Sequence, residues 1–290
     1  MIAVVTCFFN FVGFSRPEAN LHRFVRQMKR EGVPVFGVEV VAPGGKPVSQ
    51  IYKGWKWVHA GERQRLWQKE AALNLAEKMV PPEFDSIAWV DSDLWFSNPA
   101  WAAESDRLLH SGKDVLQLFS RARWTGPRGD VETSRASCIS VPFDSSWKSH
   151  PGFAWAMRRE LWVAAGGLYP RAISGGGDSI MSCAFTNSPI WGGIANHLGT
   201  NPAAFDKWAA HFKGVSVGEV PGEVFHEWHG SLKDRDYAGR SQRIASFDLT
   251  SIVDVAPNGL LQWNPAAPRD LINETALSFQ KRREDGPSKD

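Results

Sequence analysis

Residues 86–96 read SIAWVDSDLWF, and this stretch decides the fold. Its first five residues form a short, largely apolar run that predicts a buried β-strand, and Asp91 and Asp93 follow directly. Two acids in so apolar a context need a partner, because an unpaired buried carboxylate is costly. Mg²⁺ or Mn²⁺ fits, since either ion takes one or two carboxylates and fills its shell with phosphate oxygens and water. Taken alone, the two acids could instead cap a turn beside Arg or Lys.

Strands and helices alternate around this stretch, as they do in βαβ units. The order predicts an α/β fold with a doubly wound, mostly parallel sheet. Ligands of such sheets bind beyond the carboxyl ends of the strands, where the pattern places Asp91 and Asp93. The predicted strands of this half are 2–9, 35–41, 86–90 and 115–119, and the predicted helices are 17–30, 66–79 and 98–110.

The second half of the chain is less regular. We expect one domain over 1–265, with a nucleotide-binding half over 1–120 and an acceptor half over 121–265. After about Pro265 the apolar content falls, which predicts a frayed, partly disordered tail over 266–290. The further expected elements are a long loop over 121–150, strands at 153–157, 215–220 and 223–226, and helices at 158–165 and 175–185.

Composition sets the broad class of the protein. The chain has 290 residues and a net charge of only +2, so its overall charge does not indicate a nucleic-acid partner. Three widely spaced cysteines fit neither a disulfide framework nor a zinc site. No stretch approaches the ~20 apolar residues of a membrane span, and no signal peptide is recognisable, so we expect a cytoplasmic protein. Fourteen Trp against three Tyr suggest a core, and also a site, rich in indole.

Two later segments carry further candidates. The Gly-rich turn at 174–178 lets the backbone approach a ligand closely, and Asp178 at the following helix start could accept a proton or simply cap the helix. The segment 221–230 holds His226 and His229, either of which could complete the metal shell. Because neighbouring strand positions face opposite sides, we expect only one of the two to do so.

In their order and spacing, these segments resemble inverting glycosyltransferases of the GT-A fold. The resemblance covers residues 1–240 and implies a nucleotide-diphosphate sugar as donor, with Mn²⁺ or Mg²⁺ as cofactor. It implies that Asp93 is the principal metal ligand, with Asp91 near the metal or the ribose, and His229 ahead of His226 as the late ligand. It makes Asp178 the general base, which deprotonates the acceptor hydroxyl for direct displacement at the anomeric carbon.

The same resemblance implies where the donor lies. Glu39 would read the nucleobase, and the expected donor is a UDP-sugar. Lys233 or Arg235 would assist the departing diphosphate. Trp155, in a strand after Gly152, would form the acceptor wall or belong to the core. The residues expected to flank the donor are Thr6, Phe8, Arg16, Gln68, Lys69, Asp91, Ser92, Gly176 and Gly177.

The acceptor has two candidates, a glycan and DNA that carries 5-hydroxymethylpyrimidine. The second rests on a loop at 121–128, RARWTGPR, which with Arg135 mixes cations with an aromatic ring and could hold phosphates. Two other classes remain open, a nucleotidyltransferase and a non-catalytic sugar-binding module. The first usually carries an N-terminal Gly-rich loop with Arg or Lys, whereas this chain has FFNFVG at 8–13.

Overall fold

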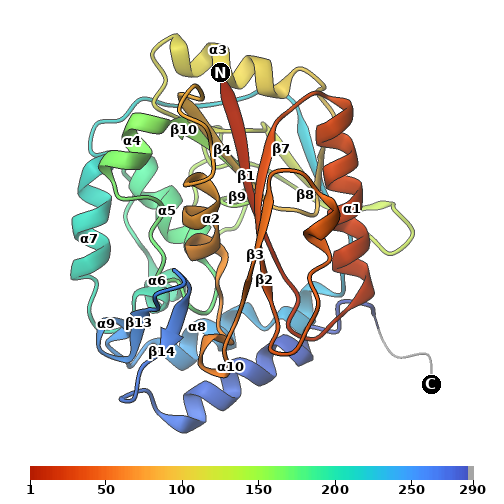
Figure 1. Ribbon diagram of the computed structural model, residues 1–290. Coiled ribbons are helices and arrows are strands. Elements are labelled where there is room, and N and C mark those ends of the chain that lie inside the picture. Colours follow the sequence, from red (N-terminus) through yellow and green to blue (C-terminus); the bar gives the residue numbers. More distant parts are fainter. Residues whose placement is uncertain (287–290) are drawn as a thin grey trace.

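The computed structural model describes residues 1–286, and its centre is a seven-stranded sheet (Figure 1). The strand order is β11-β6-β10-β4-β1-β2-β3, and only β10 runs antiparallel to its neighbours. This confirms the predicted α/β class with a mostly parallel sheet. The strands are β1 (Ile2–Phe9), β2 (Val35–Val41), β3 (Trp55–His59), β4 (Ser86–Val90), β6 (Val115–Gln117), β10 (Ala154–Arg158) and β11 (Val217–Glu219).

Helices cover both faces of the sheet. Successive residues of β1 point to opposite sides, and because both sets are apolar, each face needs a layer of helices over it. Ala3 and Val5 pack in one core cluster with α2, α5 and α7, whereas Ile2 and Val4 pack in another with α1 and α3. The helices are α1 (Ser15–Arg30), α2 (Lys69–Glu77), α3 (Trp101–His110), α4 (Arg159–Ala164), α5 (Gly177–Phe185), α6 (Gly192–Ala195), α7 (Ala203–Ala209), α8 (Tyr237–Ile244), α9 (Leu249–Ile252) and α10 (Arg269–Lys281). Short 3₁₀ turns are η1 (Ser49–Ile51), η2 (Glu62–Gln64), η3 (Asn196–Leu198), η4 (Ala210–Phe212) and η5 (Leu232–Arg235).

A second sheet replaces the long loop predicted over 121–150, so that prediction is wrong. Its order is β5-β12-β7-β8-β9, and β7 pairs in parallel with β12, about a hundred residues later in the chain. Ala122 and Trp124 are buried between the more exposed Arg121 and Arg123, which is the period-2 alternation of a strand. The strands are β5 (Leu94–Phe96), β7 (Arg121–Thr125), β8 (Val131–Ser137), β9 (Ser149–His150) and β12 (Glu223–His226), and a separate pair is β13 (Val253–Val255) with β14 (Leu261–Trp263).

The C-terminal segment is ordered as far as it is described, so the frayed tail predicted after about Pro265 is wrong for residues 269–286. Helix α10 buries Leu271 and Phe279. The Phe279 ring meets Phe11 edge-on at 5.1 Å between centroids and Phe9 at 6.4 Å. Leu271 packs in a separate cluster with Leu261 and Trp263, so two apolar side chains hold an otherwise polar helix against two parts of the core. Residues 287–290, the rest of the predicted tail, lie outside the described residues.

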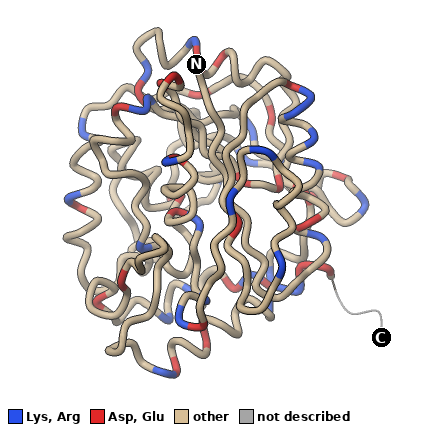
Figure 2. The backbone as a smooth tube through the Cα atoms, viewed as in Figure 1, with Lys and Arg blue, Asp and Glu red and all other residues tan. Residues whose placement is uncertain are grey.

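The surface charge is mixed. In Figure 2, Lys and Arg are interspersed with Asp and Glu along the backbone, in keeping with the net charge of +2. Among the described residues, no helix is both long and apolar enough to cross a membrane.

The packing of α10 leads to a prediction. Phe279→Ala should destabilise the fold by about 3–5 kcal/mol, because it removes a buried ring from the aromatic cluster at the end of β1. The matched control is Leu277→Ala on the same helix, where the side chain is 47% exposed and the change should stay within about 0.5 kcal/mol. Denaturant unfolding measures both, and equal, small effects would mean that α10 is not part of the folded core.

Candidate functional site

The end of β4 places Asp91, Ser92 and Asp93 at the carboxyl edge of the sheet, between the ends of β1 and β10. The Asp91 N–H donates to the Phe153 carbonyl at 3.0 Å, and Ser92 Oγ donates to the Cys7 carbonyl at 3.2 Å. These bonds tie the acidic turn to both neighbouring strands. The two carboxylates are thereby held where ligands of doubly wound sheets bind.

Asp93 meets both histidines of the late segment. Its Oδ2 lies 2.8 Å from His229 Nε2 and 3.5 Å from His226 Nε2, and the two Nε2 atoms are 3.2 Å apart. The expectation that only one histidine reaches the site is therefore wrong. Strand β12 ends at His226, so the chain beyond it turns and brings His229 back to the same side. Asp93, His226 and His229 form a cluster, here called the Asp-His-His cluster.

Two further residues orient His229. Glu284 Oε1 lies 3.0 Å from its Nδ1, and Arg282 holds that carboxylate with contacts of 2.6 and 2.8 Å. Burial raises the pKa of Glu284, but Arg282 and His229 outweigh it and lower the pKa to about 2. A carboxylate on Nδ1 leaves Nε2 free to bind a metal, which is the usual arrangement around metal-bound imidazole. Arg235 Nη2 lies 3.0 Å from the same Nε2.

The electrostatics of the Asp-His-His cluster suit a divalent cation. Burial lowers the pKa of His226 to about 3, so its imidazole is neutral and able to bind a metal. Burial raises the pKa of Asp93, but His226 and His229 outweigh it, and the pKa falls well below its usual range. Asp93 Oδ1 is buried without a hydrogen-bond partner among the described residues. One carboxylate and two imidazoles thus fit a divalent metal of the Mn²⁺ type.

Asp91 is not part of this cluster, although it was expected near the metal. Its Oδ1 lies 2.6 Å from Lys69 Nζ, at the start of α2, and the same ammonium lies 2.7 Å from Asp178 Oδ2. Burial raises the pKa of Asp91 to about 7. Burial lowers the pKa of Lys69, but Asp178 and Asp91 outweigh it and keep the ammonium charged. Lys69, expected to flank the nucleotide, therefore bridges two carboxylates.

The Gly-rich turn brings Asp178 to this edge. Gly175 and Gly176 have φ of +84° and +81°, which side chains rarely adopt. A Cβ on Gly176 would meet the His197 ring, and one on Gly177 would meet the Glu70 carboxylate. The turn thus packs tightly over buried groups and opens α5 at Gly177, next to Asp178.

Glu70 is a buried acid that the sequence analysis did not single out. Neither of its carboxylate oxygens has a hydrogen-bond partner among the described residues. Burial raises its pKa to about 8, and the nearby Asp178 adds to that shift. At neutral pH the group is therefore mainly uncharged, which lowers the cost of keeping it beside Asp91 and Asp178.

Three polar residues expected at the donor have their polar groups bonded within the protein. Thr6 Oγ1 donates to the Val90 carbonyl at 2.7 Å. The Glu39 carboxylate accepts from two backbone N–H groups of the loop after β2, at 2.8 and 3.0 Å. Gln68 is fully buried and bonds to the backbone of Leu261. These side chains fix the loops around the site.

The remaining expected residues lie in the core or at its rim. Phe8 is buried, and Trp155 stacks on Trp89 in the core with 6.4 Å between ring centroids, so Trp155 forms no acceptor wall. The Arg16 guanidinium lies 5.3 Å from the Trp228 ring centroid, at the mouth of the first loop.

Besides Glu70, two residues that sequence reasoning missed come from the C-terminal segment. Glu284 and Arg282 stand in a charged stretch that carries no local motif. Their only signal is the burial of both side chains, at 8% exposure each, and burial is visible only in the fold.

No family model and no curated protein matches the chain. Among solved structures it is similar to the catalytic domain of Drosophila β1,4-galactosyltransferase 7 in complex with xylobiose, at 15% identity and a TM-score of 0.39. The match covers 75% of this chain and 63% of that one, so the chain spans less than two thirds of that domain.

Two bacterial structures are also similar. One is S. aureus TarS 1–349 in complex with UDP-GlcNAc, at 11% identity and a TM-score of 0.49, covering 97% of this chain and 72% of that one. The other is the M. tuberculosis glucosyl-3-phosphoglycerate synthase with Mn²⁺, UDP and phosphoglyceric acid, at 14% identity and 0.44, covering 84% and 75%.

Proposed function

We propose that the protein is a metal-dependent glycosyltransferase, which moves a sugar from a nucleotide-diphosphate sugar, with UDP as the expected nucleotide, to an acceptor hydroxyl with inversion. The Asp-His-His cluster is the observation that carries the proposal. It stands at the carboxyl end of the central strand, and Lys69 holds Asp178 beside the neighbouring Asp91. A cation site and a candidate base therefore share one edge of the sheet.

Asp93, His226 and His229 would hold the metal, with Glu284 fixing the orientation of His229. Both Mg²⁺ and Mn²⁺ take carboxylate ligands, but two imidazoles favour Mn²⁺. When bound, the ion supplies positive charge that neutralises the departing diphosphate. Arg235, whose guanidinium lies beside His229, adds a second positive charge at the same place.

Asp178 is the proposed general base. Lys69 binds its Oδ2, whereas Oδ1 has no hydrogen-bond partner among the described residues and is left to accept a proton. Gly152 packs closely against the carboxylate, because a Cβ there would lie 2.9 Å from Asp178 Oδ2 and 3.1 Å from His150 Nε2. One base that activates the attacking hydroxyl is what a single displacement with inversion requires.

The acceptor hydroxyl belongs either to a glycan or to hydroxymethylated DNA. Two of the arginines that suggested DNA have partners within the protein. Arg123 forms a bidentate pair with Glu223, and Arg135 lies 5.4 Å from the Trp124 ring centroid. Arg121 and Arg128 remain exposed, but two exposed arginines supply few of the phosphate contacts that duplex DNA binding requires, so we favour the glycan.

A single assay separates the proposed class from its rivals. The protein with Mn²⁺ is incubated with a panel of nucleotide sugars, and the released phosphates are identified. A glycosyltransferase releases a nucleoside diphosphate, a nucleotidyltransferase exchanges pyrophosphate, and a sugar-binding module releases neither.

Asp93→Asn should abolish metal-dependent activity while the fold persists. We expect nucleoside diphosphate release to fall by about a hundredfold or more, because the cation loses its only carboxylate ligand in the cluster. Asp106→Asn is the matched control, since Asp106 belongs to a partly exposed acidic group with Asp85 and His110 and should leave the rate unchanged. Normal turnover of the Asp93 variant with Mn²⁺ would refute the metal role.

Asp178→Asn should separate donor binding from transfer. UDP affinity with Mn²⁺ should stay within about twofold, whereas transfer should fall by about 10²–10⁴-fold, the usual contribution of a general base. Calorimetry measures the first and product formation the second. An unchanged transfer rate would remove Asp178 as the base.

Glu284→Ala should weaken metal binding without removing a ligand. We expect the apparent affinity for Mn²⁺ to fall by about 10–100-fold, because His229 loses the carboxylate that fixes its ring. Activity at saturating Mn²⁺ should largely recover, which a collapsed site would not permit. A variant whose Mn²⁺ titration matches the original protein would contradict the positioning role.

A further inference from the structure

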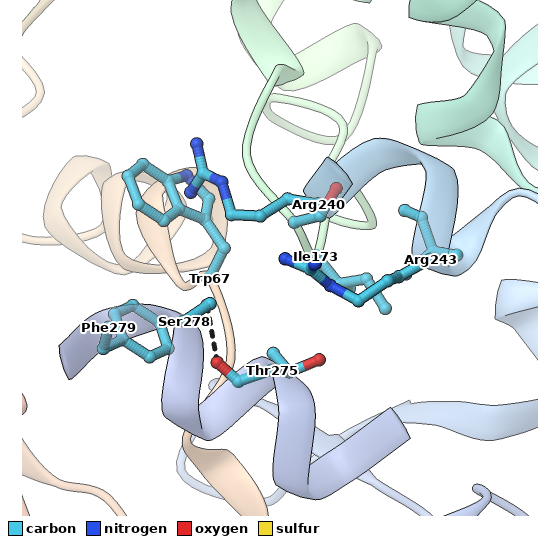
Figure 3. A pocket seen from close by; sticks show the side chains of 9 residues that line it. Trp67, Ile173, Arg240, Arg243, Thr275, Ser278 and Phe279 are labelled. Carbon is cyan, nitrogen blue, oxygen red and sulfur yellow. Dashed lines mark hydrogen bonds between the residues drawn. The ribbon is translucent and has the colours of Figure 1, made fainter. Parts of the chain in front are cut away.

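Arg240, on α8, is a buried cation without an acidic partner. Its side chain is 6% exposed, and its guanidinium carbon lies 5.5 Å from the Trp67 ring centroid and 5.1 Å from that of Tyr237 (Figure 3). Among the described residues it forms no salt bridge, and its Nε is buried without a hydrogen-bond partner. Ring faces stabilise such a cation by far less than the cost of taking an unpaired charge out of water.

The neighbouring charges do not compensate for this cost. Arg282 and Arg235 lie close enough to disfavour the charge, and together with burial, the larger cause, they lower the pKa of Arg240 to about 10. The nearest acid on the same element is Asp236, which pairs with Arg243 at 3.0 Å and accepts from the Gly239 N–H. Arg240 is therefore still charged at neutral pH and lacks a counter-ion.

A small pocket lies beside this guanidinium, between α8 and α10. Its polar lining is Arg240, Arg243 and the hydroxyls of Ser174, Thr275 and Ser278, and Trp67 forms one wall (Figure 3). No carboxylate lines the pocket. Ser278 donates to the Thr275 carbonyl, Ser174 is bonded to His197, and Arg243 is paired with Asp236, so Arg240 is the cation of this lining that has no partner among the described residues. A buried guanidinium without a counter-ion, with hydroxyl groups around it, fits a phosphate group.

The pocket reaches the Gly-rich turn that leads to Asp178. A Cβ at Gly175 would lie 3.7 Å from both terminal nitrogens of Arg240, so the absent side chain leaves the guanidinium next to the turn. The arginine at the Asp-His-His cluster is a different one, Arg235, whose Nη2 lies 3.0 Å from His229 Nε2. Arg240 thus adjoins the turn that leads to the proposed base.

We propose that this pocket binds a phosphate group carried by the acceptor, with Arg240 as its main contact. The acceptor would then be a phosphorylated or phosphodiester-linked molecule whose hydroxyl reaches Asp178 while its phosphate lies between α8 and α10. The inference rests on the proposed function and narrows its substrate class. The same phosphoryl chemistry could come from the donor diphosphate, and the experiment separates the two sources.

The test uses inorganic phosphate as the probe and the full chain as the protein. Calorimetry measures phosphate binding to the free protein and to protein saturated with UDP and Mg²⁺, and UDP binding is measured separately. We expect phosphate to bind in both states. Arg240→Gln should weaken phosphate at least tenfold and leave UDP within twofold. The matched control is Arg269→Gln, because Arg269 is exposed at the start of α10 and does not line the pocket, and it should change phosphate affinity by less than threefold.

Thermal unfolding gives a second readout, which distinguishes a phosphate-binding arginine from one that only stabilises the fold. Without phosphate, Arg240→Gln should unfold at the same temperature as the original protein or higher, because it removes an uncompensated buried charge. Phosphate should raise the unfolding temperature of the original protein and not that of the variant. A marked loss of stability in the variant, with no phosphate effect in either protein, would overturn the proposal.

The other outcomes are equally distinct. If phosphate competes with UDP, or if Arg240→Gln weakens both to the same extent, the arginine serves the donor diphosphate and the proposal fails. Absence of phosphate binding to the original protein also overturns it. Failure of the proposed function is recognised separately, because no nucleotide sugar would then release a nucleoside diphosphate with Mn²⁺, whatever phosphate does in the free protein.

Discussion

The buried ammonium of Lys69 holds the site together, because it bridges acids from two different elements. Its Nζ contacts Asp91 at the end of β4 and Asp178 at the start of α5, at 2.6 and 2.7 Å. Without a cation between them, carboxylates this close in a buried site repel one another. The lysine itself comes from the first residue of α2, so a helix start, a strand end and a glycine turn meet at one charge.

The fold was predictable where its signals are local. The strands at 2–9, 35–41 and 86–90 follow from short apolar runs, and they match β1, β2 and β4. The errors fall where the decisive contact is remote. Strand β7 is held by β12, and α10 by the rings of Phe9 and Phe11, so neither partner is visible within the local sequence window. Arg121 and Arg123, at alternate positions of β7, also made this strand resemble a polar loop in the sequence.

The residues of the candidate site also divide into those that local sequence signals predicted and those whose role depends on remote contacts. Asp93, His226 and His229 were predictable because each stands at or just beyond the end of a recognisable strand. The role of Lys69 was not, because a helix start gives no indication of which acids lie across from it. Thr6, Glu39 and Gln68 show the converse error, since polar residues near a site can serve the backbone instead. Only the three-dimensional hydrogen bonds distinguish these roles.

The acids and arginines around the site are not paired directly with one another. Asp93 and Asp178 each keep one carboxylate oxygen without a partner, and Arg235 and Arg240 each keep an unbonded Nε, all among the described residues. Direct pairing of these acids and arginines would be more stable, but it would fill the space that ligands need. His229 and Trp67 stand between the two sets, in contact with Arg235 and Arg240 respectively. Asp93 and Asp178 have cationic or imidazole partners on one oxygen only, so each side chain retains an atom that a ligand could bond.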